Sequence, residues 1–176
     1  WRFEGTLLLF FTPCVVHGAV IIQDMQCTVS SVRLSDGTAS WSEKFKSQDK
    51  KMRATSTGQA VAIKSISLVV AAANRPGKKE WNAQYGGQGC ARAFDLWTGK
   101  LKWQQDFDLE ANTAPAVTKF GPDGSPMVIF SLGATPGGPI KEGAFGDNWQ
   151  TRIVALAAAT GTPLWSHDFE PWAHYG

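Results

Sequence analysis

Short apolar segments alternate with turn-forming residues along the chain, and one such pattern occurs three times. Each copy has an apolar segment, a Gly-containing turn, a Trp and then a Phe: Gly37 with Trp41 and Phe45, Gly99 with Trp103 and Phe107, and Gly161 with Trp165 and Phe169. Successive copies are 62 residues apart. Because Asp36-Gly37, Thr98-Gly99 and Thr160-Gly161 supply a residue that takes positive φ at little steric cost, each copy predicts a β-hairpin with the Trp on its second strand.

The same period predicts further strands before each hairpin. Residues 65–70 correspond to residues 127–132 at an offset of 62, and residues 60–64 and 114–119 have the apolar character of additional strands. The Gly-Pro-Asp-Gly-Ser-Pro segment at 121–126 predicts a turn. Four antiparallel strands per repeat follow, and a helical repeat is excluded by the frequent Gly and Pro.

Four-stranded repeats of this kind bury both faces only by stacking on neighbours, as the blades of a β-propeller do. We therefore predict an all-β chain that forms part of one propeller domain with an incomplete ring and blades at about 1–45, 52–107 and 113–169. The apolar stretch at 6–11 is too short to span a bilayer and is interpreted as a buried strand. Long Gly-rich loops at 74–89 and 133–150 are where binding residues usually lie.

Composition and charge narrow the possible partners. The 18 Gly, 9 Pro and 8 Trp suit many short strands, and a formal net charge of +2 gives no field that would favour nucleic acid. The basic cluster at 44–53 is predicted to be a solvated loop, the alternative being a docking patch for an acidic partner. The three cysteines, Cys14, Cys27 and Cys90, show no metal-ligand spacing and no Cys-x-x-Cys pair, so we expect structural or free thiols. The alternative is one disulfide in an oxidising compartment, without a defined pairing.

The second hairpin carries a specific resemblance. Residues 93–103 read Ala-Phe-Asp-Leu-Trp-Thr-Gly-Lys-Leu-Lys-Trp and resemble the tryptophan-docking repeat of quinoprotein alcohol dehydrogenases, which bind pyrroloquinoline quinone. The resemblance covers nearly the whole chain and weakens in the first repeat, where Arg33 and Ser35 depart from the pattern. It implies that the repeated Trp residues pack between blades. Because such rings have about eight blades, we expect the chain to be part of a longer protein or to have its open strand edges covered by other blades or subunits.

The third repeat resembles the cofactor-binding part of that family. Gly146-Asp147-Asn148-Trp149 is similar to a segment that leads into a blade near the quinone, and the segment around Trp172 falls where the family has its catalytic Asp. The resemblance therefore assigns Asp147, Asn148, Trp149 and Trp172 as the candidate cofactor-binding residues. However, Ala173 replaces the Asp, and Ala134 stands where the family has a calcium-binding Asn. The adjacent cysteine pair of the family is also missing, since Cys90 lies between Gly89 and Ala91.

Other candidate groups have simple structural interpretations. His174 with Glu170 could form a base and its orienting carboxylate, and a surface role is the alternative. The loop at 75–81 combines basic residues with a Trp and is either a protein contact or a solvated connection.

Two hypotheses of different classes follow. The first is a non-catalytic propeller that acts as a binding or scaffold module, and the alternative is a fragment of a quinone-dependent dehydrogenase that oxidises an alcohol or polyol. For this chain alone we expect neither quinone nor calcium to bind, whereas an active parent enzyme would use both. We predict no nucleic-acid partner and no membrane-spanning segment, and the resemblance implies an extracytoplasmic or organellar lumen.

Overall fold

The computed structural model describes residues 2, 12–45, 58–75, 89–119, 121, 123–134 and 149–172, with the backbone alone at 134, 149, 150 and 170–172. These residues form three four-stranded antiparallel sheets. The predicted all-β class is confirmed. Residues 6–11 and the basic segment at 46–53 lie outside the described residues.

The first sheet has the order β1-β2-β3-β4 and consists of β1 (Cys14–Val16), β2 (Ala19–Gln23), β3 (Val29–Arg33) and β4 (Ala39–Glu43). The second has the order β5-β6-β7-β8 and consists of β5 (Val61–Ile63), β6 (Leu68–Asn74), β7 (Gly89–Asp95) and β8 (Leu101–Asp106), with the short 3-10 helix η1 (Lys64–Ile66) between β5 and β6. The third has the order β9-β10-β11-β12 and consists of β9 (Ala116–Thr118), β10 (Met127–Ala134), β11 (Trp149–Ala157) and β12 (Pro163–Trp172).

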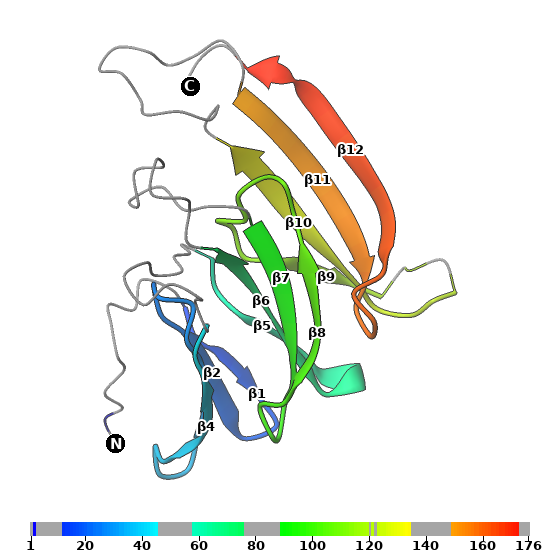
Figure 1. Ribbon diagram of the computed structural model, residues 1–176. Coiled ribbons are helices and arrows are strands. Elements are labelled where there is room, and N and C mark those ends of the chain that lie inside the picture. The colour runs from blue at the N-terminus through cyan, green and yellow to red at the C-terminus, as the bar shows by residue number, and fades with distance from the viewer. Residues whose placement is uncertain are drawn as a thin grey trace, which may run out of the picture.

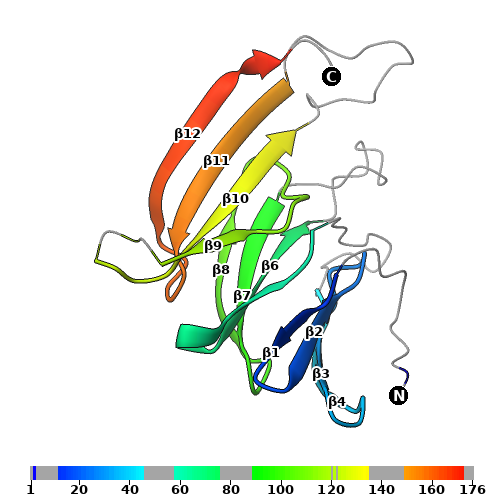
Figure 2. The same cartoon turned by 180° about the vertical axis from the view of Figure 1, so that it is seen from behind.

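The three sheets lie face to face in chain order, as Figures 1 and 2 show from opposite sides. The first strands of the sheets contact one another, β1 with β5 and β5 with β9, whereas β4, β8 and β12 form the far edges. This fan-like stacking is the arrangement of propeller blades around an axis. The strands β6 and β10 end on the same side of the fan in both views.

The two central strands of the middle sheet, β6 and β7, are buried on both faces. Every residue of β6 and the first six residues of β7 are buried. A strand covered on both sides reads as a continuous apolar run, which explains the Leu-Val-Val-Ala-Ala-Ala sequence of β6. One face packs on the first sheet through a cluster that includes Trp41, Val69 and Phe94, and the other packs on the third sheet through a cluster that includes Val70, Phe130 and Leu156.

The three hairpin turns have one backbone geometry. Gly37, Gly99 and Gly161 have φ values of 74°, 71° and 75°. In each turn the Gly N–H donates to the carbonyl oxygen four residues earlier, at 2.9 Å, 2.9 Å and 2.8 Å in chain order. The predicted hairpins are therefore confirmed, and glycine is required because a side chain is strained at such positive φ.

The predicted correspondence of earlier strands is wrong by three residues. The strand expected from Ser65 begins at Leu68, because residues 64–66 form η1 and Ser67 turns the chain with φ 51°. Leu68 pairs with Asp95 and Met127 pairs with Ala157, so Leu68 rather than Ser65 corresponds to Met127. The period of 62 holds for the two strands of each hairpin. It fails for β6 and β10 because the strand pairs β6–β7 and β10–β11, each taken with its connecting loop, differ in length.

Candidate functional site: tryptophan docking and the loop-bearing ends of the sheets

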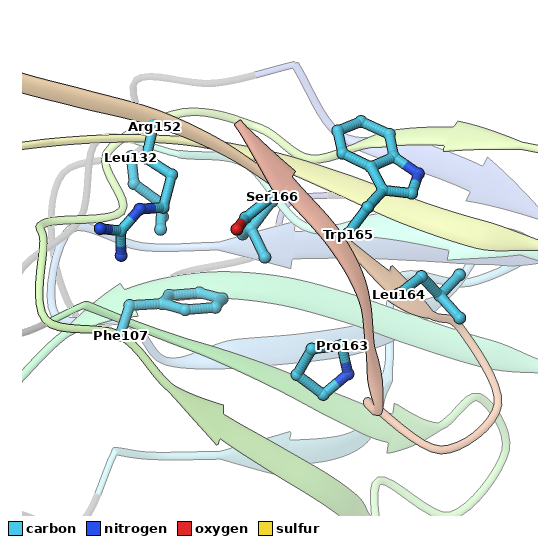
Figure 3. Close-up of a pocket in the computed structure, with 8 residues that line it drawn as sticks. Phe107, Leu132, Arg152, Pro163, Leu164, Trp165 and Ser166 are labelled. Atoms are coloured by element: carbon cyan, nitrogen blue, oxygen red, sulfur yellow. The ribbon is translucent and has the colours of Figure 1, made fainter. Parts of the chain in front are cut away.

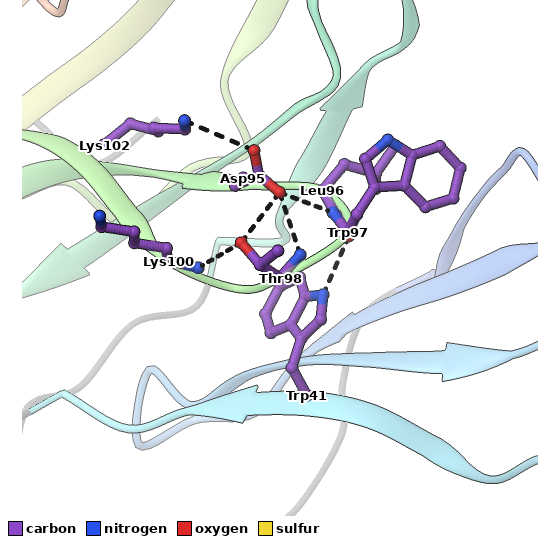
Figure 4. Close-up of polar contacts among 7 residues, drawn as sticks. All are labelled: Trp41, Asp95, Leu96, Trp97, Thr98, Lys100 and Lys102. Carbon is purple, nitrogen blue, oxygen red and sulfur yellow. Dashed lines mark hydrogen bonds and ion pairs between the residues drawn. The ribbon is translucent and has the colours of Figure 1, made fainter.

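The repeated Trp of the first sheet docks on the hairpin turn of the second. Trp41 is 8% exposed, and its Nε1 donates a hydrogen bond of 2.9 Å to the carbonyl oxygen of Leu96. A Cβ on Gly99 would lie only 2.6 Å from the Trp41 ring, so the ring rests against the bare glycine backbone. Figure 4 shows this contact beside the Asp95 carboxylate, which accepts hydrogen bonds from the turn.

The Asp95 carboxylate makes that turn rigid. Its Oδ1 accepts from the backbone N–H groups of Trp97 and Thr98 at 3.1 Å and 3.0 Å, and from the Thr98 hydroxyl at 3.0 Å. Although partial burial of Asp95 opposes ionisation, the hydrogen bonds from Thr98 hold the pKa of Asp95 below its usual value. The turn therefore presents the Leu96 carbonyl and the Gly99 backbone in a fixed geometry.

The second docking repeats the first. Trp103 Nε1 donates a 2.9 Å hydrogen bond to the carbonyl oxygen of Ala158, and a Cβ on Gly161 would lie 2.6 Å from the Trp103 ring. Trp103 is half-buried. In both cases the acceptor is three residues before the glycine, so the two junctions follow one rule.

The third Trp departs from the predicted burial. Trp165 is 44% exposed, and Leu164 and Phe169 on the same strand are 36% and 46% exposed. The prediction that all three Trp residues are largely buried is therefore wrong for Trp165. Trp41 and Trp103 are each covered by the hairpin of the next sheet. The described residues contain no sheet beyond the third, so no such hairpin covers Trp165.

Some of the residues that the family resemblance assigns to cofactor binding lie among the described residues. Trp149 and Trp172 are backbone partners in the β11–β12 pairing, and Ala134 is paired with Gln150 on the neighbouring strand. The third sheet thus brings these positions together at one end. Asp147, Asn148, Ala173 and His174 lie outside the described residues, and for Trp149, Glu170 and Trp172 only the backbone is described.

The donor set for calcium is incomplete where it is described. Ala134 has a methyl side chain, which offers no oxygen to a hard cation. Across the described residues, no group of three or more His, Cys, Asp or Glu side chains is placed to hold a metal ion. Where the structure describes this end of the third sheet, Ala134 therefore supplies no side-chain ligand for calcium.

A pocket lies on the third sheet beside Phe107. Its volume is about 220 Å³, and its walls comprise Phe107, Leu132, Arg152, Val154, Pro163, Leu164, Trp165 and Ser166 (Figure 3). Arg152 is tied by Nη1 to Asp108 at 2.8 Å and by Nε to Asp168. These hydrogen bonds and ion pairs raise the pKa of Arg152, the bond to Asp168 most. Because its charge is neutralised locally, the pocket offers an apolar wall rather than an anion site.

Sequence reasoning missed a buried polar cluster between the first and second sheets. Arg92 is 7% exposed and its guanidinium carbon lies 4.8 Å and 4.7 Å from the ring centroids of Phe45 and Phe94. Among the described residues, its Nε and Nη1 have no hydrogen-bond partner. Burial lowers the pKa of Arg92. Gln23 lies at the same junction, where its Nε2 donates to the carbonyl oxygen of Ala72 at 2.7 Å.

A second polar network ties the link between the second and third sheets. Asn74 Oδ1 accepts from the Ala111 N–H at 2.7 Å, Asn74 Nδ2 donates to Asn112, and Asn112 donates to Glu110 at 2.9 Å. The backbone of Glu110 exchanges two 3.0 Å hydrogen bonds with Gly133. Burial raises the pKa of the Glu110 carboxyl, and the Asn112 hydrogen bond opposes this. The network fixes the connecting segment rather than forming a reactive site.

Comparison with known proteins supports the fold. No family model matches the chain, and no curated protein does. Among solved structures, it is similar to the quinohemoprotein alcohol dehydrogenase of Comamonas testosteroni, with 19% identity, a TM-score of 0.64, and coverage of 90% of this chain and 27% of that one. The chain has the fold of a partial β-propeller.

Two further solved structures show a similar likeness. A quinohemoprotein alcohol dehydrogenase from Pseudomonas putida shows 18% identity and a TM-score of 0.61, with 88% of this propeller segment and 26% of that chain covered. BamB from Moraxella catarrhalis shows 14% identity and a TM-score of 0.58, with 94% and 39% covered. The segment therefore spans less than half the length of each of these proteins. Within its described residues, no helix has the length and apolar character needed to cross a membrane.

Proposed function

We propose that this propeller segment is a non-catalytic binding and scaffold module whose third sheet receives a further four-stranded blade through Trp165. The observation that carries the proposal is the docking series. Trp41 and Trp103 each contact the hairpin of the next sheet, whereas Trp165 occupies the same repeat position and is 44% exposed. A third docking would complete the series.

The two occupied junctions define the partner. It presents a hairpin with a glycine in the left-handed conformation, and a carbonyl oxygen three residues before that glycine, as Leu96 with Gly99 and Ala158 with Gly161 do. Continuity with these junctions favours a blade of the same repeat. Such a blade would also cover Phe169 and bury aromatic surface at about 25 cal/mol per Å² of apolar area.

The donor set supports the non-catalytic part of the proposal. A quinone-dependent dehydrogenase needs oxygen donors for calcium, and Ala134 supplies none from its side chain. The rigid core is retained, with the two central strands of the middle sheet buried on both faces. A propeller that keeps its core and lacks these donors suits a role in holding other molecules.

The test compares two single variants of the full-length protein. Trp165→Ala removes the docking side chain, and Leu164→Ala is the matched control on the neighbouring position of β12. If a blade docks on Trp165, Trp165→Ala lowers the free energy of unfolding by about 3 kcal/mol, as expected for a buried aromatic, and Leu164→Ala by less than about 1 kcal/mol. Equal, small effects of the two variants would contradict the docking.

The catalytic alternative is tested separately by calorimetry. We expect no saturable heat when the full-length protein is titrated with pyrroloquinoline quinone in the presence of calcium. Tight binding of both, together with dye-linked oxidation of an alcohol, would overturn the non-catalytic part and leave the docking result intact.

A further inference from the structure

Two thiols from different sheets meet at the junction that Arg92 occupies. Cys27 belongs to the turn between β2 and β3, and Cys90 is the second residue of β7. With Ala73 they form one buried cluster, at 1% and 0% exposure for the two thiol residues. Cys14 packs in a different cluster.

Packing brings the two cysteines to the same place. Both thiols are free in this structure, and the two residues share a buried cluster with Ala73. Ala73 is the direct cross-strand partner of Cys90 in the β6–β7 pairing. Directly opposite residues in an antiparallel pair have Cβ atoms about 4.5–5.5 Å apart. Cys27, which packs on this cluster from the first sheet, therefore lies beside Cys90.

The turn that carries Cys27 is rigid and strained. The Asp24 carboxylate accepts from the Gln26 and Thr28 N–H groups at 2.9 Å and 2.8 Å, and the Cys27 N–H donates to the Asp24 carbonyl at 2.9 Å. Cys27 has φ 60°, a left-handed conformation in which Gly or Asn is less strained. Cys27 therefore holds its thiol at the junction of the two sheets in a backbone conformation that favours Gly or Asn.

We infer that Cys27 and Cys90 form a disulfide that joins the first and second sheets. The reaction is a thiol–disulfide exchange with a small disulfide oxidant such as oxidised glutathione. One protein thiolate attacks the oxidant and releases one thiol, and the second protein thiolate then displaces the other, so that two S–H bonds are lost, one S–S bond forms and the oxidant is reduced to two thiols. Two protons and two electrons pass to the oxidant.

Burial determines when the bond forms. It raises the pKa of Cys27 to about 12 and that of Cys90 to about 12, so neither thiol is ionised in the closed junction near neutral pH. Exchange therefore takes place during folding, or when the two sheets separate. Once formed, the bond is sheltered from reductants by the same burial.

The experiment maps thiols in the full-length protein after refolding with reduced and oxidised glutathione. Free thiols are alkylated under denaturing conditions and peptides are identified by mass spectrometry without reduction. The expected result is a Cys27–Cys90 cross-linked peptide with Cys14 alkylated, and a rise of about 5–15 °C in the Tm of the oxidised over the reduced protein.

Variants separate a cross-link from simple packing. Cys27→Ala, Cys90→Ala and the double variant each lose the redox-dependent rise in Tm, and the double variant behaves as the single ones do, whereas Cys14→Ala retains the rise. A variant that fails to fold leaves the peptide map of the unmodified protein as the deciding result. Complete alkylation of both Cys27 and Cys90 after oxidative refolding, or pairing of either with another cysteine, would overturn the inference.

Discussion

The indole nitrogen of Trp103 donates a hydrogen bond of 2.9 Å to the carbonyl oxygen of Ala158, in the hairpin turn of the next sheet. The two residues are 55 positions apart, and Trp41 has the same relation to Leu96 across the preceding junction. The Gly-to-Trp spacing is a local feature of the sequence, and it identifies residues that contact one another across two sheets. The contact exists because each ring fits the bare backbone of a glycine in the neighbouring sheet.

The Trp41 docking is expected to contribute strongly to stability. Trp41→Ala removes a ring that is 8% exposed, and we expect a loss of about 3–5 kcal/mol in the free energy of unfolding. Trp41→Phe keeps an aromatic ring but leaves the Leu96 carbonyl without its donor, at a cost of about 1–3 kcal/mol. Trp97→Ala is the control, because Trp97 is 55% exposed, and should cost less than about 1 kcal/mol in the same denaturant titration.

The glycine partner of the dock gives a second test. Gly99→Ala introduces a Cβ 2.6 Å from the Trp41 ring at a residue with φ 71°, so both ring displacement and backbone strain contribute. We expect a loss of about 2–4 kcal/mol. Gly124→Ala is matched for φ, at 78°, and has no atom within 4 Å of the new Cβ, so it reports strain alone at about 1 kcal/mol. Equal losses in chemical denaturation would show that the ring contact contributes nothing.

The hairpins and the all-β class are predictable from the sequence because they depend on local chemistry. The glycines at 37, 99 and 161 take positive φ, and the strands on either side keep a period of 62 residues. The first two strands of each sheet do not keep that period. Leu68 and its partner Asp95 are 27 residues apart, whereas Met127 and its partner Ala157 are 30 residues apart, so the pair β6–β7 with its connecting loop is shorter than the pair β10–β11 with its loop. The period of a hairpin says nothing of the length of the strand and loop that precede it.

The candidate site is less predictable because it depends on contacts between sheets. Arg92 lies on β7 between Ala71 and Gln104 of the neighbouring strands, and its counterparts at the repeat period, Ser30 and Val154, carry no charge. Nothing local indicates that its guanidinium is buried between two rings. The exposure of Trp165 has the same origin, since the burial of Trp41 and Trp103 comes from a neighbouring sheet rather than from their own strand.

The raised pKa of Glu110 predicts a pH dependence of stability. Because burial raises this pKa above its unfolded value of 4.5, the neutral carboxyl is favoured in the folded protein. The resulting stabilisation is fully present below pH 4.5 and is lost as the pH rises through the folded pKa. Glu110→Gln is neutral throughout and retains an acceptor for the Asn112 hydrogen bond. The stability of the variant relative to the parent should therefore be greater at pH 7 than at pH 4, as measured by urea unfolding, and an identical difference at both values would contradict this origin.

Most substitutions in a protein core lower stability. For the buried guanidinium of Arg92 we expect the opposite when an uncharged side chain of similar length replaces it. Its Nε and Nη1 have no hydrogen-bond partner in the part of the chain that the structure describes and its charge is desolvated, so we expect the folded protein to carry a cost that the two aromatic contacts offset only in part. Arg92→Met keeps an unbranched side chain between Phe45 and Phe94 and removes the charge, so we expect unchanged or increased stability, by about 1 kcal/mol. Arg92→Ala empties the space and should lower stability by about 2 kcal/mol.

Denaturant unfolding of both variants distinguishes packing from charge. A loss in Arg92→Met as large as in Arg92→Ala would mean that the guanidinium itself stabilises the junction, and that its unpaired N–H groups bind an anionic group in the folded protein.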